Sequence, residues 1–175
     1  MKILRYHHPN YKYKTHPLLR YCGALQVAHI IEAKVWKKLS YRSLMPWISG
    51  YVGLCGPGKV FNVLKNNIDN VSLTQNNTID VLKREIDDNK ICLLLVGHGY
   101  NQGGEWFNII KAIILQHYIS IWWYDEEKDW FFVYDSSIKS AQNLPIGNIF
   151  LSTWTLKKCW SRWWLWIYQN ILIKL

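Results

Sequence analysis

Apolar residues with helical spacing dominate the first half of the chain. Between Cys22 and Leu39 they recur every three or four positions, and lysines occupy the opposite face and the C-terminal end, so a helix is expected there. A second, better-marked helix is expected over 78–89, because Asn77 or Thr78 can cap its first turn. Weaker patterns predict a short helix or turn over 40–47, a glycine-rich loop over 50–58, a short helix over 59–68 and a brief strand over 71–74.

Strand signals dominate the second half. Residues 91–97 form a continuous apolar run of strand length, which predicts a central buried strand. The aromatic and β-branched stretches 117–124 and 130–134 flank the charged segment 125–129, which predicts an antiparallel hairpin. The remaining expectations are a loop over 97–104, an ambiguous segment over 105–116, a loop over 144–148, a helix over 153–163 capped by Ser152, and a last strand from the apolar C-terminal residues.

This order of elements predicts an α+β fold. Helices come first and an antiparallel sheet follows, after an irregular, basic and aromatic lead-in over 1–15. The 175 residues suffice for one domain with a hydrophobic core, and half of them are hydrophobic, which excludes a disordered chain. The sequence contains no internal repeat, so a single domain over 1–175 is expected.

The cysteines and the apolar runs of the sequence indicate the cellular compartment in which the protein is expected. Cys22, Cys55, Cys92 and Cys159 are far apart and form no C-x-x-C pair, which argues against a structural zinc site and a disulfide scaffold. The N-terminus has no apolar core long enough for a signal peptide, and no uncharged run reaches membrane-spanning length. We therefore expect a cytoplasmic protein without a transmembrane segment.

The net charge of +9 is spread unevenly. Residues 1–68 hold 11 Lys and Arg against one acid, whereas 69–135 hold 5 against 11 and 136–175 hold 5 against none. The basic N-terminal third fits an anionic partner such as a nucleic acid, a membrane surface or an acidic peptide. A solvated, lysine-rich surface accounts for the same distribution and is the favoured interpretation.

Cys22 opens the first predicted helix. The unsatisfied backbone N–H groups and the positive dipole of a helix start favour a thiolate, so a cysteine there is a candidate nucleophile. The alternative is an inert core residue, because free cysteines are among the most buried side chains. A nucleophilic role requires an imidazole to hold the thiol proton and a third group to orient that imidazole.

His117 is the histidine best placed to act as this base. It begins a strand whose hairpin partner ends in Asp135, and a turn centred near Glu126 would place the two residues opposite each other on the same face. Of the other histidines, His29 is expected in the core and His98, between two glycines, is expected to be exposed. The alternative is that His117 is a strand-edge residue and Asp135 a turn former.

The ordered motifs resemble the papain-like cysteine peptidases, and above all the branch of bacteriocin-leader (double-glycine) peptidases. The resemblance spans roughly residues 16–170. It consists of Cys22-Gly23-Ala24 opening a helix, Val81-Leu82-Lys83 through Val96, His117-Tyr118-Ile119, Val133-Tyr134-Asp135-Ser136-Ser137 and Leu144-Pro145-Ile146-Gly147-Asn148 before residues 152–160. The resemblance implies a helical half packed on an antiparallel sheet, with Cys22, His117 and Asp135 as a catalytic triad.

Two features depart from this pattern. The family's oxyanion-hole glutamine lies about six residues before the cysteine, and His16 stands at that spacing here. An imidazole N–H of His16 and the Cys22 backbone N–H would then be the two donors. In addition, Cys55-Gly56-Pro57 is itself a form of the family motif, so Cys55 is an alternative nucleophile.

The expected function is therefore cleavage of a peptide bond in a peptide or protein substrate through a Cys22 acyl-enzyme, with no metal and no cofactor. The same acyl-enzyme also suits an acyl transferase. Two alternatives from other classes stay open. One is a peptidase-fold binding protein with a degraded site, and the other is a basic, aromatic nucleic-acid-binding domain.

Overall fold

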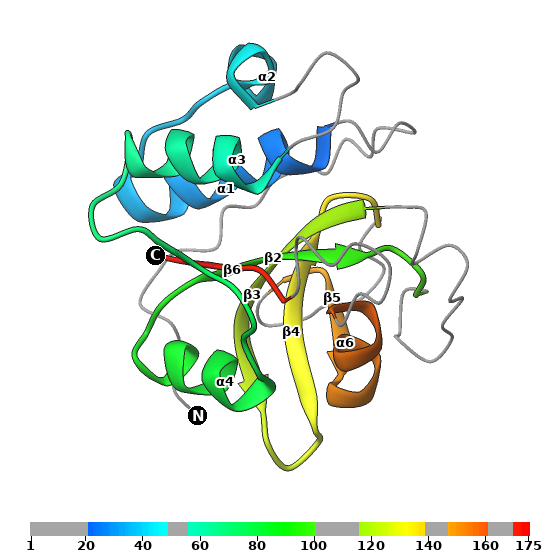
Figure 1. The fold of residues 1–175 in the computed structure, drawn as a ribbon. Coiled ribbons are helices and arrows are strands. Elements are labelled where there is room, and N and C mark those ends of the chain that lie inside the picture. The colour runs from blue at the N-terminus through cyan, green and yellow to red at the C-terminus, as the bar shows by residue number, and fades with distance from the viewer. Residues whose placement is uncertain (1–20, 49–55, 101–115, 139–146, 161–169) are drawn as a thin grey trace.

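The computed structural model describes residues 21–48, 56–100, 116–138, 147–160 and 170–175. His16, Cys55 and most of the ambiguous segment 105–116 lie outside these residues. The described part is a mixed α/β structure with helices on both faces of an antiparallel sheet (Figure 1). Among the described residues, no helix has the length and apolar character needed to cross a bilayer.

Within the described residues the sheet has six strands in the order β1-β6-β2-β3-β4-β5, and every neighbouring pair is antiparallel. The strands are β1 (Ser72–Thr74), β2 (Cys92–Gly97), β3 (Gln116–Asp125), β4 (Trp130–Asp135), β5 (Ile149–Ser152) and β6 (Leu172–Lys174). The predicted buried strand, hairpin and last strand are confirmed as β2, β3–β4 and β6. Strand β5 was not expected, because its four residues resembled a loop leading into a helix cap.

Side chains of β2 alternate between two hydrophobic clusters. Leu93 and Leu95 pack under the first three helices, α1 (Cys22–Val35), α2 (Tyr41–Ile48) and α3 (Pro57–Lys65). Leu94 and Val96 pack on the opposite face with α4 (Ile79–Asp87) and α6 (Thr153–Trp160). Because both faces are covered, β2 is apolar throughout, which explains the continuous run in the sequence (Figure 1).

Two helix boundaries differ from the sequence pattern, and two others have the caps that it predicts. The expected helix over 22–39 ends at Val35, because Trp36 is left-handed (φ 58°) and its N–H closes the last turn on the Glu32 carbonyl at 3.0 Å. Helix α3 begins at Pro57, earlier than predicted, since proline is favoured in a first turn. The caps predicted for α4 and α6 are confirmed: Thr78 accepts from the Val81 N–H, and Ser152 accepts from the Thr155 N–H.

The register of the β3–β4 hairpin differs from the prediction. Asp135 lies opposite Ile119, so the prediction that it lies opposite His117 is wrong by two positions. The turn is centred later than Glu126, since Asp125 pairs with Trp130, and a bulge adds a residue to β3 between Ile121 and Trp123. An even slip keeps His117 and Asp135 on the same face of the sheet, as diagonal neighbours.

The connection into β5 requires a glycine. Gly147 has φ +77°, and a Cβ at this position would lie 2.3 Å from the Val133 carbonyl oxygen. The following Asn148 N–H donates to the same oxygen at 2.9 Å, so the backbone approaches β4 closely here. Only glycine can adopt this positive φ and also leave room for the Val133 carbonyl, because it has no Cβ.

We predict that Gly147→Ala lowers the free energy of unfolding by at least about 2 kcal/mol, because it adds left-handed strain to a backbone clash. Gly58→Ala is the matched control, since no atom lies within 4 Å of its added Cβ and the residue is in α3. There the same change should stabilise by about 0.5–1 kcal/mol. Urea denaturation of both variants tests this, and equal effects at the two positions would contradict it.

Candidate active site

Cys22 is the first residue of α1 and is 7% exposed. The preceding Tyr21 provides no side-chain cap, and the first turn contains no acidic residue. The N–H groups and the dipole of this helix end are therefore directed at the sulfur without a competing carboxylate. This is the local environment that the sequence pattern predicted for Cys22.

His117 and Asp135 form a fully buried pair. The His117 Nε2 lies 2.6 Å from the Asp135 Oδ1, and neither side chain has any exposed surface. Burial opposes the charged form of His117, but the charges of Asp135 and Cys22 outweigh it and raise the pKa of His117 to about 10. Burial would also raise the pKa of Asp135, yet the charge and hydrogen bond of His117 hold that pKa well below its usual range.

Cys22 lies close enough to His117 to affect its pKa. Its charge and its contact both raise the pKa of His117, so the two groups are close. The Nδ1 of His117 nevertheless makes no hydrogen bond of ordinary length and angle within the described residues. Such contacts are often loose before a substrate binds. Asp135 therefore holds one ring nitrogen of His117, and Nδ1 has no hydrogen bond within the described residues.

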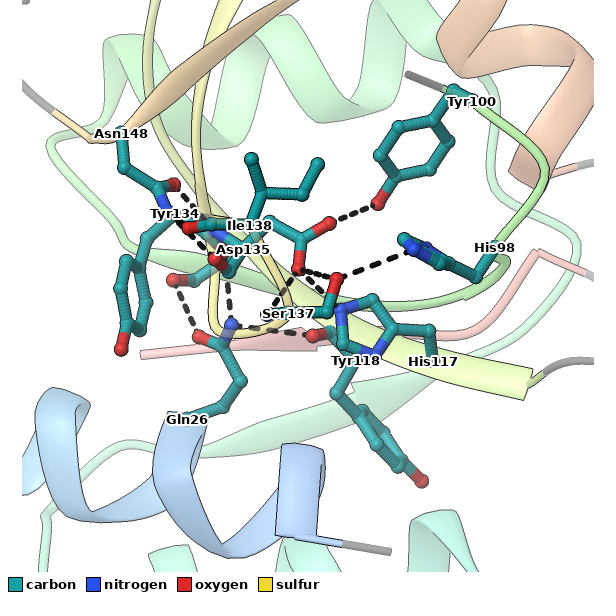
Figure 2. A network of polar contacts seen from close by, with 11 residues as sticks. Gln26, His98, Tyr100, His117, Tyr118, Tyr134, Asp135, Ser137, Ile138 and Asn148 are labelled. Atoms are coloured by element: carbon teal, nitrogen blue, oxygen red, sulfur yellow. Dashed lines mark hydrogen bonds and ion pairs between the residues drawn. The ribbon is translucent and has the colours of Figure 1, made fainter. Parts of the chain in front are cut away.

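Two further residues hold the Asp135 carboxylate through three donors (Figure 2). The Tyr100 hydroxyl donates to Oδ2 at 2.7 Å, and the Ser137 N–H and hydroxyl donate to Oδ1 at 2.7 and 2.6 Å. Burial and the charge of Asp135 raise the pKa of Tyr100 well above its usual value, so its hydroxyl stays a donor. Each carboxylate oxygen is thus satisfied, which a buried charge requires.

Asn148 holds the backbone of the same residue. Its side-chain oxygen accepts from the Asp135 N–H at 2.7 Å, and its amide donates to the Asp135 and Ile138 carbonyls at 2.6 and 2.8 Å. Asn148 has no exposed surface, so these bonds face no competition from water. The Gly147-Asn148 pair, which carried part of the resemblance, therefore positions Asp135.

His98 is a second imidazole at this site. The prediction that it is exposed is wrong: it is half-buried, and its Nε2 lies 3.2 Å from the Ser137 hydroxyl (Figure 2). Its ring centroid is 4.9 Å from that of His117 and 5.0 Å from that of Tyr100. The Gly97-His98-Gly99 pattern suggested a solvent loop, but it continues directly from the buried strand β2.

Gln26 attaches α1 to the strands of the site (Figure 2). Its amide donates to the carbonyls of Tyr118 and Tyr134 at 3.2 and 2.9 Å, and its oxygen accepts from the Ser120 hydroxyl at 2.8 Å. It has no exposed surface. Sequence reasoning missed this residue, although a glutamine one turn into an otherwise apolar helix face was a signal.

The remaining residues considered for catalysis are one core histidine and two residues outside the described part of the chain. His29 is a core residue as predicted, 1% exposed and packed against the rings of Trp122 and Tyr134. His16 and Cys55, the predicted oxyanion donor and alternative nucleophile, lie outside the described residues. Within the described residues, the group of ligand-type side chains able to hold a metal ion is His98, His117 and Asp135.

The fold is that of a known class. A crystal structure of a candidate C39-like peptidase from Bacillus anthracis superposes with a TM-score of 0.60, at 11% sequence identity, over 89% of this chain and 88% of the other. No family model matches the chain, and no curated protein matches it. The chain therefore has the fold of a C39-like peptidase, consistent with a papain-like fold.

We predict that Tyr100→Phe lowers the free energy of unfolding by about 1–3 kcal/mol, since it removes one donor from a buried carboxylate. Tyr124→Phe is the matched control, because its hydroxyl also contacts a carboxylate, that of Asp87 at 3.1 Å, but near the surface. That change should cost less than about 0.5 kcal/mol. Thermal and urea denaturation measure both. If Tyr100→Phe lowers the free energy of unfolding no more than Tyr124→Phe does, the contact between Tyr100 and Asp135 adds nothing to stability.

The raised pKa of His117 predicts how the stability of the fold depends on pH. The pKa of His117 is near 6.5 in the unfolded chain and about 10 in the folded chain. Between these two pH values the folded chain keeps a proton on His117 that the unfolded chain releases. The stability from the His117–Asp135 pair is therefore complete below about pH 6.5 and is lost as the pH rises toward 10. Imidazole nitrogen NMR should find His117 protonated at pH 8, and its pKa should fall in Cys22→Ala. A neutral His117 ring at pH 8 would refute this.

Proposed function

We propose that the chain is a cysteine-type peptidase, a single domain over 1–175 that cleaves a peptide bond through a Cys22 acyl-enzyme. The proposal is supported by the buried His117 imidazole, which Asp135 holds through Nε2 and which lies close enough to Cys22 for the sulfur to raise its pKa. A protonated imidazole beside a helix-start cysteine favours the thiolate, which is the reactive form. The peptidase-like fold supports the same reading.

The reaction follows from these positions. The Cys22 sulfur attacks the scissile carbonyl carbon, and a tetrahedral intermediate forms with negative charge on the former carbonyl oxygen. His117 gives its Nδ1 proton to the leaving amine as the C–N bond breaks, which leaves a thioester on Cys22. His117 then takes a proton from water, whose oxygen attacks the thioester, and the acid product leaves as the thiolate re-forms. Asp135 keeps the ring oriented throughout.

The intermediate's oxyanion needs two donors. We assign one to the Cys22 backbone N–H, which belongs to the first turn of α1 and has no intrahelical acceptor. The second is proposed to come from His16, the residue at the family's glutamine spacing. Losing one such donor costs about 10²–10³ in rate, so His16→Ala should lower turnover by this factor if the assignment is correct.

Labelling with a peptidyl electrophile tests the proposed function without a known substrate. We expect Cys22 of the folded chain to react at least about 100-fold faster than in the denatured chain, because the site activates the sulfur. Cys22→Ala should abolish the fast reaction, and His117→Ala should slow it strongly. Cys92→Ala is the control, since burial raises the pKa of Cys92 and its thiol should not react.

Peptide mapping by mass spectrometry identifies the labelled cysteine. Fast labelling at Cys55 in place of Cys22 would assign the nucleophile to the alternative C-G-P motif. Labelling of Cys22 at the denatured rate would reject the enzyme reading and leave a binding protein with this fold. Cleavage of a peptide library by the wild-type chain, absent in Cys22→Ala, would establish hydrolysis.

A further inference from the structure

His98 is the group at this site that the proposed reaction does not use. It follows β2, His117 begins β3 and Asp135 ends β4, so three strands bring these residues together. One ligand atom from each residue lies within 4.8 Å of the others. The sequence separates them widely and contains no metal-binding motif, so this grouping is visible only in the fold.

We propose that His98, His117 and Asp135 form a binding site for a divalent transition metal of the zinc class, and that the bound metal blocks the peptidase reaction. The inhibition rests on the proposed function, whereas the binding does not. Two imidazole nitrogens and one carboxylate oxygen are a common protein ligand set for zinc. The same set does not suit magnesium or calcium, which prefer oxygen ligands alone.

The geometry needs only local adjustment. Zinc bonds of about 2.0–2.1 Å in a tetrahedron place the ligand atoms about 3.3–3.5 Å apart. The His117 Nε2 and Asp135 Oδ1 are now 2.6 Å apart, and all the ligand atoms lie within 4.8 Å, so shifts on the order of 1 Å suffice. The Ser137 hydroxyl, 3.2 Å from His98 Nε2 and 2.6 Å from Asp135 Oδ1, would turn aside to make room.

The surrounding contacts are those that a metal site needs. Tyr100 donates to the Asp135 oxygen that is not the ligand, and Asn148 fixes the backbone of Asp135. Such outer contacts orient a ligand and exclude water around it. His117 and Asp135 are fully buried and His98 is half-buried, so the metal would enter from the His98 side.

Metal binding has a direct consequence for the proposed reaction. When the metal takes the Nε2 lone pair of His117, the proton on that nitrogen passes to solvent and the remaining proton stays on Nδ1. A ring in this state would become an imidazolate if it gave its Nδ1 proton to the leaving amine, and it cannot accept a further proton from Cys22 or from water at Nδ1. The base is therefore lost while the thiol itself stays unligated.

Calorimetric titration of the metal-free full chain with zinc chloride tests the binding. We expect one zinc per chain and no binding of magnesium. Since changing an outer contact already costs about 10–100-fold in metal affinity, His98→Ala should weaken zinc binding by at least about 100-fold. Tyr100→Phe should weaken it by about 10–100-fold. Denaturation curves confirm that each variant folds.

Two variants separate this site from its rivals. Cys22→Ala should still bind one zinc without a large loss of affinity, because the sulfur is not a ligand; a large loss would move the metal to Cys22 and the opposite ring nitrogen. The double variant His7→Ala/His8→Ala should also bind normally, and a loss there would assign the zinc to the N-terminal histidine pair. Either loss would overturn the proposal. Cobalt(II) should give ligand-field absorption without a thiolate charge-transfer band.

Inhibition is then measured against each protein's own zinc-free labelling or cleavage rate. Zinc should inhibit the wild type at the concentration at which it binds, and His98→Ala should require at least about 100-fold more zinc. Inhibition unchanged by His98→Ala would overturn the regulatory role. A chain that binds zinc at this site but never labels or cleaves would overturn the proposed peptidase and leave the metal site standing.

Discussion

The Asp135 carboxylate carries a charge with no exposure to solvent, and much of the site is built to stabilise that charge. A buried charge costs several kcal/mol unless it is paired and hydrogen-bonded. His117 provides the opposite charge, Tyr100 and Ser137 provide the neutral donors, and Asn148 holds the backbone. These groups come from the end of β2, the start of β3, the end of β4 and the entry to β5. Satisfying one carboxylate therefore fixes the relative positions of four strands at this end of the sheet.

Local patterns in the sequence predicted the elements that carry the site. The apolar run of β2, the hairpin around the charged turn and the caps at Thr78 and Ser152 each depend on a few adjacent residues, and the structure confirms them. The pairing of His117 with Asp135 was also predicted, although from a register that is wrong by two positions. It was still right about the shared face, because an even slip leaves side chains on the same side.

The contacts that complete the site could not be predicted, since they join distant segments through buried polar groups. Tyr100 and Asp135 are 35 residues apart, and Gln26 reaches backbone carbonyls up to 108 residues away. A tyrosine in a glycine-rich loop and a glutamine in a helix have no local pattern that names their partners. The position of His98 was also unpredictable from the sequence, because its flanking glycines indicate a turn but do not show which other residues the turn lies beside. The bulge in β3 depends on how the sheet twists against its helices, which no short window of sequence records.

The position of β6 has a consequence for how the molecule is made. This strand lies between β1 and β2 and is synthesised after every other strand. Until it emerges, β1 has no neighbouring strand among the described residues. The side-chain amides of Asn77 and Asn170, 93 residues apart, also cannot donate to each other's backbone carbonyls. A sheet closed by such distant contacts is expected to fold slowly. The helix bearing Cys22 precedes the described strands in the chain, but it packs on a sheet that is complete only when β6 is inserted, so the site is finished only after that distant strand has paired.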